Sequence, residues 1–364
     1  MCARTIPFRQ WPNMTNQVPD VVGGLPQFKF FMEYGPGEGR KVTSDGSGTE
    51  SNVTKLPIAE NLAGVSMRLN PGALRELHWH ANAAEWGYCV RGGVRITAMD
   101  LDGRWEIADC DEGDAFFFPR GLGHSIQGLG PEESHFILIF DNGHFSEFGT
   151  FSSTDWIGHS PAHVLGTNFG VSADTFAKFP KSEQWIVPGP VPAPISENVG
   201  NPHPVRFVYR MSAMEAQHFP GGSLKLVTAN EFPMSNTMCG AVMTLQPGAL
   251  RELHWHPAVD EWQYVIAGKL RVGLFGSGGR YRIEDLIVGD SAYIPSGYGH
   301  HIENTGDTDA TMLFGFNSGF HHSVSASDWF GKNSTQLLAT NFGVPESTFS
   351  KMTFGNKFIR SRLP

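Results

Sequence analysis

The feature that most constrains the fold is an internal repeat. Residues 70–96, NPGALRELHWHANAAEWGYCVRGGVRI, match residues 246–272, QPGALRELHWHPAVDEWQYVIAGKLRV, at an offset of 176. Two upstream runs, QFKFFMEY at 27–34 and PVRFVYRM at 204–211, also correspond, so each copy begins well before its histidines. Self-similarity at a fixed offset indicates two copies of one structural unit.

The two copies differ in length at one place within the matched span. The offset is 176 as far as Gly143 and Gly319, and it is 173 from Asp155 and Asp328 onward. The three extra residues therefore lie in a short segment of the first copy, and that segment carries an acid, Glu147, that the second copy lacks. This insertion is the candidate for a functional difference between the copies.

Length and composition favour a globular protein of two domains. The chain has 364 residues, of which 40% are hydrophobic and 17% are charged, and it contains no apolar run near the ~20 residues that a membrane span needs. A Pro-rich stretch at 185–204 indicates a semi-rigid linker, so we predict domains at 1–184 and 185–364. The net charge of −9 argues against a nucleic-acid partner.

The fold class predicted for both copies is all-β. Short apolar or alternating runs such as VSMRLNPG, DAFFFP and HFILIFDNG are separated by Gly, Pro and Asp. This pattern is typical of an antiparallel sandwich or barrel. The segment SSTDWIGHSPAHVLGTNFGV and its partner in the second copy should form short helices, since Ser-x-x-Asp before an apolar run resembles a capping box.

Four side chains in each copy indicate a metal site. Histidines at i and i+2 of a strand project to the same face, and a Glu and a third His follow. The candidates are His78, His80, Glu85 and His124 in the first copy and His254, His256, Glu261 and His300 in the second. Three imidazoles and a carboxylate allow Mn, Fe, Zn, Cu or Ni, and the carboxylate favours Mn or Fe. A lone buried His is usually a core residue, but recurrence of all four argues for metal binding.

The motif GxxxRELHWHxxxxEW followed by GDxxFxPxGxxH resembles the germin-like cupins, and its duplication resembles the bicupin oxalate decarboxylases. The resemblance implies one cupin barrel, a double-stranded β-helix, per copy with one Mn in each. It also implies assembly as a homohexamer or trimer. The implied reaction is the O2-dependent, redox-neutral conversion of oxalate to formate and CO2.

Two residues are candidates for catalysis in the first copy. Arg75 lies three residues before His78, which on a regular strand would put it on the opposite face, but we expect a bend at the preceding Pro-Gly. The resemblance implies that Arg75 orients the substrate; the alternative is a structural Arg paired with a carboxylate. Glu147 would ordinarily be a solvated loop charge. The resemblance implies instead a Ser-Glu lid, around 144–151, whose acid handles the proton, although Phe148-Gly149-Thr150 departs from the commoner Asn-Ser-Thr.

The second copy is predicted to bind metal and to support the structure. Where the resemblance implies a Glu, this chain has Phe314, and the shorter loop offers His321 and His322 as alternative proton donors but no acid. The tryptophans beside the ligands are interpreted as barrel packing; they are Trp79, Trp86, Trp255 and Trp262.

Two other functions remain open on the sequence. One is an oxalate oxidase, which would make CO2 and H2O2, and the other is a manganese-binding storage bicupin with little turnover. The opening sequence MCARTIPFRQWPNMT has no apolar stretch typical of a secretory signal. We therefore expect a soluble, cytoplasmic protein for the chain as given, or a periplasmic or secreted one if this is a processed form.

Overall fold

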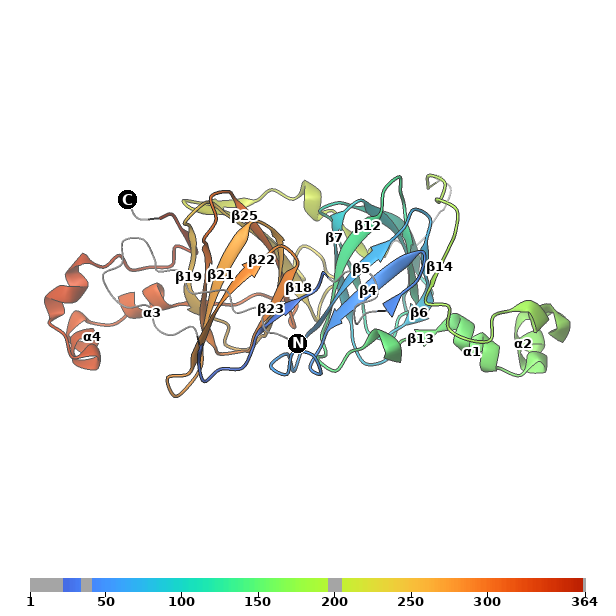
Figure 1. The fold of residues 1–364 in the computed structure, drawn as a ribbon, viewed down its shortest axis with the longest axis horizontal. Helices are drawn as coiled ribbons and strands as arrows, with labels where there is room; N and C mark the ends of the chain where they lie inside the picture. Colours follow the sequence, from blue (N-terminus) through green and yellow to red (C-terminus); the bar gives the residue numbers. More distant parts are fainter. Residues whose placement is uncertain (1–21, 34–40, 196–204, 363–364) are drawn as a thin grey trace.

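The computed structural model describes residues 22–33, 41–195 and 205–362. Two β-barrels lie next to each other along the long axis, and a helical extension projects outward from each of them at opposite ends of the molecule (Figure 1). The prediction of an all-β fold with short helical extensions is confirmed. Because two similar barrels are joined in one chain, the repeat seen in the sequence is also a repeat in space.

The first barrel consists of two antiparallel sheets. Its strands are β3 (Lys41–Val42), β4 (Gly46–Ser51), β5 (Ala63–Leu69), β6 (Leu74–Trp79), β7 (Glu85–Arg91), β8 (Gly93–Met99), β9 (Trp105–Asp111), β10 (Ala115–Phe118), β11 (His124–Gly128), β12 (Ser134–Phe140), β13 (Phe151–Ser152), β14 (Ile186–Val187) and β15 (Val208–Tyr209). One sheet has the order β15-β10-β7-β12-β5-β4-β3, and the other has β13-β6-β11-β8-β9 with β14 also paired to β6.

The second barrel repeats this arrangement. Its strands are β1 (Val22–Gly23), β2 (Lys29–Phe31), β16 (Gln217–Phe219), β17 (Gly222–Val227), β18 (Cys239–Leu245), β19 (Leu250–Trp255), β20 (Glu261–Ala267), β21 (Lys269–Phe275), β22 (Tyr281–Ile287), β23 (Asp290–Ile294), β24 (Gly299–Asn304), β25 (Ala310–Phe316), β26 (Val324–Ser325) and β27 (Ile359–Arg360). The sheet orders are β16-β17-β18-β25-β20-β23-β2 and β1-β22-β21-β24-β19-β26, with β27 paired to β19.

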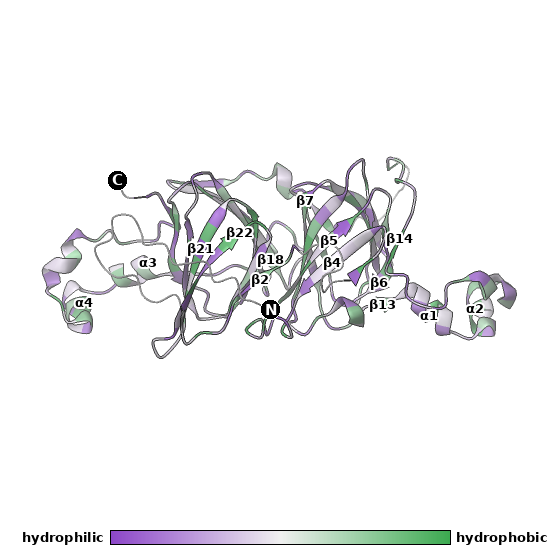
Figure 2. Cartoon of the chain, in the orientation of Figure 1, coloured by the Kyte–Doolittle hydropathy of each residue, from purple (hydrophilic) through white to green (hydrophobic). Residues whose placement is uncertain are grey.

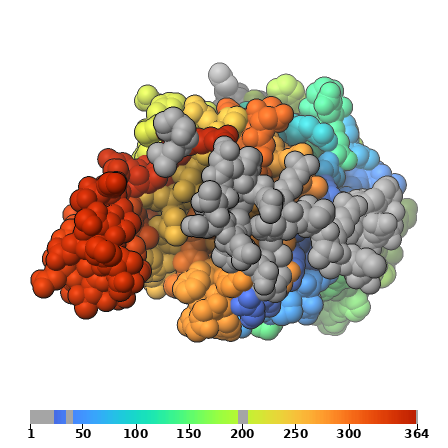
Figure 3. All heavy atoms as spheres, turned by 60° about the vertical axis from the view of Figure 1, so that its left-hand side comes forward, coloured from blue at the N-terminus to red at the C-terminus, as the bar shows by residue number. Residues whose placement is uncertain are grey.

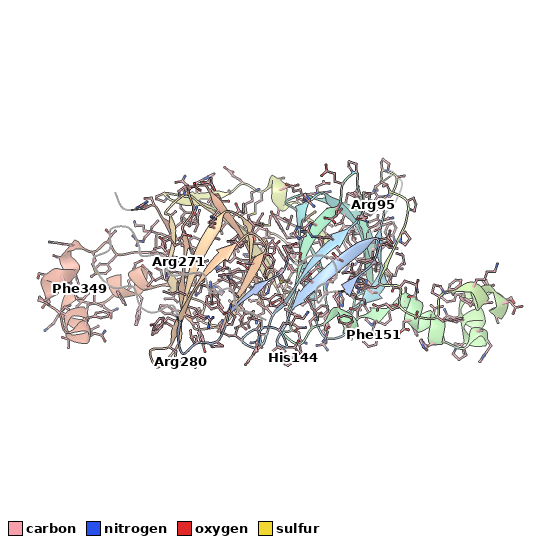
Figure 4. All side chains as sticks on the ribbon, viewed as in Figure 1. Arg95, His144, Phe151, Arg271, Arg280 and Phe349 are labelled. Atoms are coloured by element: carbon pink, nitrogen blue, oxygen red, sulfur yellow. The ribbon has the colours of Figure 1, made fainter. Side chains whose placement is uncertain are left out.

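Corresponding side-chain pairs show how closely the barrels repeat. Arg95 on β8 reaches Asp109 with Nε at 2.7 Å from the carboxylate, and Arg271 on β21 reaches Asp285 at 2.6 Å. Figure 4 labels the two arginines on the sheets of their respective barrels. The equivalent ion pairs bridge equivalent neighbouring strands, β8 to β9 and β21 to β22.

Strands near the start of each copy join the barrel of the other copy, and β1 pairs with β22 of the second barrel. β2 pairs with β23 of the second barrel, and β15 pairs with β10 of the first barrel. The domain boundary near residue 185 stays a prediction, but this exchange means that a cut there would remove an edge strand from each barrel. Parts of the runs and of the linker used in that prediction, residues 34 and 196–204, lie outside the described residues.

Hydrophobic residues form a core in each barrel and a third cluster between the barrels. Figure 2 shows apolar and polar residues mixed along the strands, as expected for sheets with one buried face. In the cluster between the barrels, Trp86 lies against Gly240 of β18, and Trp262 lies against Gly64 of β5. The sequence indicated packing within one barrel for these tryptophans. In the structure Trp86 and Trp262 also pack against the other barrel and so join the two.

The helical extensions follow the barrels as the sequence predicted. The helices are η1 (Glu147–Gly149), α1 (Ser153–His159), α2 (Ala162–Phe169), η2 (Ala173–Lys178), η3 (Met211–Ala213), α3 (Ala326–Gly331), α4 (Thr335–Phe342) and η4 (Glu346–Lys351). Ser152 caps α1 and Ser325 caps α3, each accepting the amide of the Asp three residues later, so the capping prediction is confirmed. Figure 3 shows the second extension protruding as a lobe beside its barrel. Within the described residues, no helix combines the length and apolarity needed to cross a membrane.

Candidate metal centres

The structure brings together the four predicted ligands of the first copy. His78 lies on β6 and His80 directly follows that strand, while Glu85 begins β7 and His124 begins β11. One nitrogen or oxygen of each side chain lies within 4.8 Å of the others, and all four residues are buried. Strand ends from both sheets thus converge at one place in the barrel.

The second copy has the same arrangement. Its four predicted ligands are buried, and their ligand atoms also lie within 4.8 Å of one another. They occupy the corresponding strand positions at β19, β20 and β24, and they are His254, His256, Glu261 and His300. Each barrel therefore holds one group of three imidazoles and one carboxylate.

Backbone carbonyls fix the orientation of two imidazoles in the first group and of three in the second. In the first group, His78 Nδ1 lies 2.5 Å from the carbonyl oxygen of Glu76, and His124 Nδ1 lies 2.9 Å from that of Leu122. A carbonyl only accepts, so Nδ1 carries the proton and Nε2 keeps a free lone pair. This is the tautomer that a metal ligand needs, and it comes from the loop conformation next to each histidine.

The second group repeats this support and differs at one histidine. His254 Nδ1 and His300 Nδ1 lie 2.7 and 3.0 Å from backbone carbonyls. The third imidazole, His256, also donates to a carbonyl, that of His322, at 2.7 Å. Its equivalent, His80, instead has the hydroxyl of Thr150 at 3.4 Å from Nδ1. In the first group, a hydroxyl side chain of the loop around Glu147 therefore takes the place that a backbone carbonyl has in the second group.

Several polar atoms of these groups lack a hydrogen-bond partner among the described residues, although they are buried. They are Glu85 Oε1, His124 Nε2, His256 Nε2 and His300 Nε2. Buried polar atoms without partners are costly, so atoms of this kind that converge on one point fit a bound cation. A mixed set of imidazole nitrogens and a carboxylate oxygen suits a divalent transition metal.

The protonation states agree with metal binding. Burial lowers the pKa of His78 well below its ordinary value, so its imidazole is neutral. Burial alone would raise the pKa of Glu85, but the imidazoles of His80 and His124, whose Nε2 atoms lie 2.9 and 3.3 Å from Glu85 Oε2, outweigh it and lower the pKa to about 2. A neutral imidazole and an ionised carboxylate are the forms that bind a metal.

Arg75 reaches the first site because strand β6 is irregular. The register of β6 against β11 pairs His78 with His124 but Arg75 with Ile126, so three residues of β6 span two of β11. Such a bulge turns Arg75 to the face of His78. The expected turn is present at Pro71-Gly72, where Gly72 has a φ of 79°, but the irregularity that redirects Arg75 lies between Arg75 and His78. The second copy has the same shift between Arg251 and His254.

Glu147 is a buried residue of the first site and not a solvated loop charge. It begins η1, it is 3% exposed, and its Oε2 accepts a hydrogen bond from Arg75 Nη2 at 3.1 Å. The indole nitrogen of Trp185 donates to the same oxygen at 2.9 Å. Glu147 Oε1 has no hydrogen-bond partner among the described residues. The inserted loop is thus closed over the site with its carboxylate directed inward.

Glu50 on β4 holds this loop closed. Its carboxylate accepts the backbone amide of Glu147 at 3.0 Å and the hydroxyl of Ser146 at 3.1 Å. The sequence offered one signal for this residue, because the repeat places Leu226 of the second copy at the position of Glu50. Because the acid is present only in the copy that has the insertion, it indicates a contact between Glu50 and the inserted loop.

Trp185 was also missed as a site residue, since the sequence places it at the start of the predicted linker. The structure puts its indole against Glu147, and β14 directly after it pairs with β6. Its backbone has a φ of 63°, and the amides of Gln184 and Trp185 donate to Glu76 Oε1 at 2.8 and 2.7 Å. The equivalent residue in the second copy, Phe358, has a φ of 57°. Alignment of Trp185 with Phe358 at the offset of 173 would have shown that Trp185 belongs to the repeated unit and not to the linker.

Among the residues that the structure describes, none in the second site is equivalent to Glu147. Phe314 and Leu226 contribute apolar walls, and Arg251 occupies the position of Arg75. The ring of His321 lies 5.0 Å from that of His256, and burial lowers the pKa of His321 to about 3. A neutral imidazole with so low a pKa is a poor proton donor near neutral pH.

Comparisons with known proteins agree with this geometry. Residues 37–176 and 215–349 match the family model described as Cupin. Over 293 residues the chain is 42% identical to the oxalate decarboxylase OxdC of Bacillus subtilis strain 168, covering 79% of this chain and 76% of that protein. It is 33% identical over 321 residues to a probable oxalate decarboxylase of Arthroderma benhamiae, covering 86% of this chain and 78% of that protein.

Solved structures of the bacterial relative have the same fold. The structure of oxalate decarboxylase from Bacillus subtilis at pH 4.6 matches with a TM-score of 0.86 at 36% identity, covering 95% of this chain and 90% of that one. Another structure of this bacterial enzyme, which accompanies an assignment of the EPR fine structure parameters of its Mn(II) centres, also gives a TM-score of 0.86 at 36% identity, covering 94% of this chain and 90% of that one.

Proposed function

Because the chain belongs to the bicupin oxalate decarboxylase family, we propose that it is a manganese-dependent oxalate decarboxylase that converts oxalate to formate and CO2 at the first centre. The observation that carries this proposal is the buried contact between Glu147 and Arg75 beside the first group of ligands. In the described residues the second group has no such acid. One site with both a cation and an acid suits a reaction that must both hold a dianion and deliver a proton.

The four residues that would hold manganese in the first barrel are His78, His80, Glu85 and His124. The corresponding four in the second barrel would hold another ion. Manganese, with O2 as co-catalyst, would supply the one-electron redox chemistry that makes cleavage of the C–C bond of oxalate feasible. The remaining requirements fall on side chains of the chain itself.

Arg75 is the proposed substrate-orienting residue. Its guanidinium is a planar fork that matches a carboxylate, and it is 1% exposed, so an ion pair formed there is not weakened by water. The backbone carbonyl of Trp185 holds one end of this guanidinium, with Nη1 at 3.3 Å from the oxygen. The fixed guanidinium would stabilise negative charge on the departing carboxyl group.

Glu147 is the proposed proton donor to the carbon that becomes formate. The carboxylate lies in a closed site and is hydrogen-bonded through one oxygen, while the other, Oε1, has no partner among the described residues. Glu147, ionised in its pair with Arg75, would take up one proton before the step and deliver it to the carbon as CO2 leaves, so that oxalate dianion and one proton give formate and CO2. Closure of the loop also excludes water, which favours proton transfer to carbon over side reactions.

Oligomeric assembly is the remaining proposal from family membership. We propose a trimer or homohexamer, supported by apolar residues exposed on the helical extensions. In α1 and α3, Trp156 and Trp329 are 64% and 55% exposed, and Phe169 and Phe342 at the ends of α2 and α4 are 57% and 48% exposed. Apolar side chains gathered on a projecting element are typical of protein interfaces.

The test combines metal analysis with product analysis. Purified, manganese-loaded protein is given oxalate, and formate and H2O2 are measured for the unchanged chain and for Glu147→Ala. The expected result is formate from the unchanged chain and a loss of at least a hundredfold in Glu147→Ala with manganese retained. Peroxide without formate would identify an oxidase, and full metal occupancy without consumption of oxalate would identify a storage protein. Unchanged formate production by Glu147→Ala would remove this residue from the mechanism.

A further inference from the structure

The second centre contains a buried cation without an ion-pair partner. Arg251 is 4% exposed, and none of the described carboxylates lies within 4.0 Å of its nitrogens. Its hydrogen bonds are long, at 3.4 Å to the hydroxyl of Ser323 and 3.5 Å to the carbonyl of Phe358. Its equivalent in the first centre, Arg75, has the carboxylate of Glu147 at 3.1 Å. The two centres therefore differ in whether the protein itself neutralises the arginine.

The ring of Phe358 gives Arg251 partial compensation only. The guanidinium carbon lies 3.6 Å from the centre of this ring, which is a cation–π contact. Such a contact holds the guanidinium in place, and a ring face accepts no conventional hydrogen bond, so the N–H groups remain able to bind an acceptor. A buried charge that is neither solvated nor paired is unfavourable, and an anion that enters beside it relieves that cost.

A small cavity lies next to Arg251 and the second group of candidate ligands. Its lining combines Arg251, His254 and Glu261 with apolar side chains that include Leu226 and Phe314. A divalent ion held by the ligand set would add to the positive charge of this cavity. The apolar walls offer no polar partner to a large or strongly hydrated ligand. The combination selects a small anion that binds through one planar group.

We propose that the second centre binds a small carboxylate, with Arg251 as its anchor, and does not convert it. A carboxylate matches the planar fork of the guanidinium and would place its oxygens between Arg251 and the metal ligands. Conversion is not expected, because this loop lacks an acid equivalent to Glu147. Oxalate and formate, the substrate and the product of the proposed reaction, both carry this group. The inference rests on the proposed metal and substrate, but it does not depend on turnover at the first centre.

Binding is measured directly and separately from activity. His80→Ala removes a candidate ligand from the first centre, so manganese bound by this variant, determined by metal analysis, reports the second centre. Equilibrium dialysis with ¹⁴C-labelled formate and, separately, with ¹⁴C-labelled oxalate then measures the carboxylate bound per chain. The expected result is close to one equivalent of at least one of the two anions. Binding of formate alone, oxalate alone or both supports the proposal and shows whether the second centre binds the substrate, the product or both.

Three further variants in the His80→Ala background decide the role of Arg251. Arg251→Met should weaken carboxylate binding at least tenfold with manganese content unchanged, and Arg251→Lys should restore only part of the affinity, since an ammonium lacks the planar fork. The matched control Arg280→Met, which replaces an exposed arginine of the same barrel outside the cavity lining, should have no effect. If Arg251→Met does not fold, Leu226→Glu supplies an internal carboxylate near Arg251 and should weaken binding by competition.

Two results would overturn the proposal. One result is that neither formate nor oxalate binds to the manganese-loaded His80→Ala protein. The other is that the carboxylate binds with the same affinity whether or not Arg251 is present. Failure of the proposed function would look different, because it would be a failure of the unchanged chain to make formate from oxalate. Each conclusion can therefore fail without the other.

Discussion

The side chains of Arg75 and Glu147 form a buried ion pair, with Arg75 Nη2 3.1 Å from Glu147 Oε2 and with exposed fractions of 1% and 3%. The two residues come from strand β6 and from the insertion after β12, far apart in the sequence. The pair links closure of the loop to the cation that would hold the substrate. Each residue neutralises the other in a place that water does not reach.

Loss of one partner of this pair should cost more stability than loss of both. Glu147→Leu leaves Arg75 as an unpaired buried charge, so we expect the free energy of unfolding to fall by about 3 kcal/mol. The double variant Arg75→Met/Glu147→Leu should recover most of this loss. Guanidinium chloride unfolding of the metal-free proteins measures both effects. Additive losses in the double variant would mean that the two residues do not interact.

Removal of Glu50 should open the loop without changing the acid. Glu50→Leu, which introduces the residue of the second copy, deletes the acceptor of the Glu147 amide and of the Ser146 hydroxyl. We expect kcat for formate to fall roughly tenfold or more and cleavage by added protease within 144–151 to become faster. Lys55→Met is the matched control, because Lys55 contacts Glu50 at 3.4 Å without touching the loop. Equal kcat in Glu50→Leu and the control would count against this role.

Equivalent ligand substitutions should separate the two centres. His80→Ala and His256→Ala should each lower bound manganese by about one ion per chain, because each removes one of four ligands from a buried group. Formate production should be lost in His80→Ala and largely kept in His256→Ala. Metal analysis and formate assay on the same preparations check this. Loss of formate only in His256→Ala would move turnover to the second barrel.

The contact between the barrels should respond strongly to one added methyl group. A Cβ on Gly240 would lie 2.2 Å from Cζ2 of Trp86, which is too close for any two unbonded carbons. We expect Gly240→Ala to lower the free energy of unfolding by about 1–3 kcal/mol, and the double variant Gly240→Ala/Trp86→Phe to recover part of it. Gly149→Ala, where no atom lies within 4 Å of the new Cβ, is the control. Thermal unfolding measures all three.

The pH dependence of stability should include a term from Glu303. Burial raises its pKa to about 7, from 4.5. Between pH 4.5 and 7 the folded state therefore binds more protons at Glu303 than the unfolded state does. The contribution of Glu303 to the free energy of unfolding is complete below pH 4.5 and is lost as the pH rises through 7. Glu303→Gln introduces the residue of the first copy, Gln127, and cannot ionise. We expect the free energy of unfolding of Glu303→Gln to exceed that of the unchanged chain by about 1 kcal/mol at pH 8, after allowance for screening by solvent. At pH 4.5 we expect the two free energies to be equal.

That comparison uses melting curves at both pH values. Asp307→Asn changes a surface carboxylate near Glu303 in sequence and serves as the control for altered net charge. If the melting temperatures of Glu303→Gln and the unchanged chain differ by the same amount at pH 4.5 and pH 8, ionisation of Glu303 does not contribute to the pH dependence of stability.

The sequence by itself determined the features that depend on local pattern. Alternating strands and the duplicated RELHWH motif indicated two β-barrels, each with one group of four candidate ligands. Side chains at i and i+2 share a strand face wherever that strand lies, so His78 and His80 could be placed together without knowledge of the rest of the chain. The capping residues Ser152 and Ser325 are local in the same sense.

Only the tertiary structure decided the features that depend on long-range register. The bulge in β6 brings Arg75 to the ligand face, and it is visible only against the paired strand β11. Trp185 enters the first site through pairing of β14 with β6. Glu147 faces inward because Glu50, nearly a hundred residues earlier, holds its loop. The exchange of β2 and β15 between the barrels is of the same kind. Such contacts are selected by the free energy of the whole packed chain, and short stretches of sequence do not encode them.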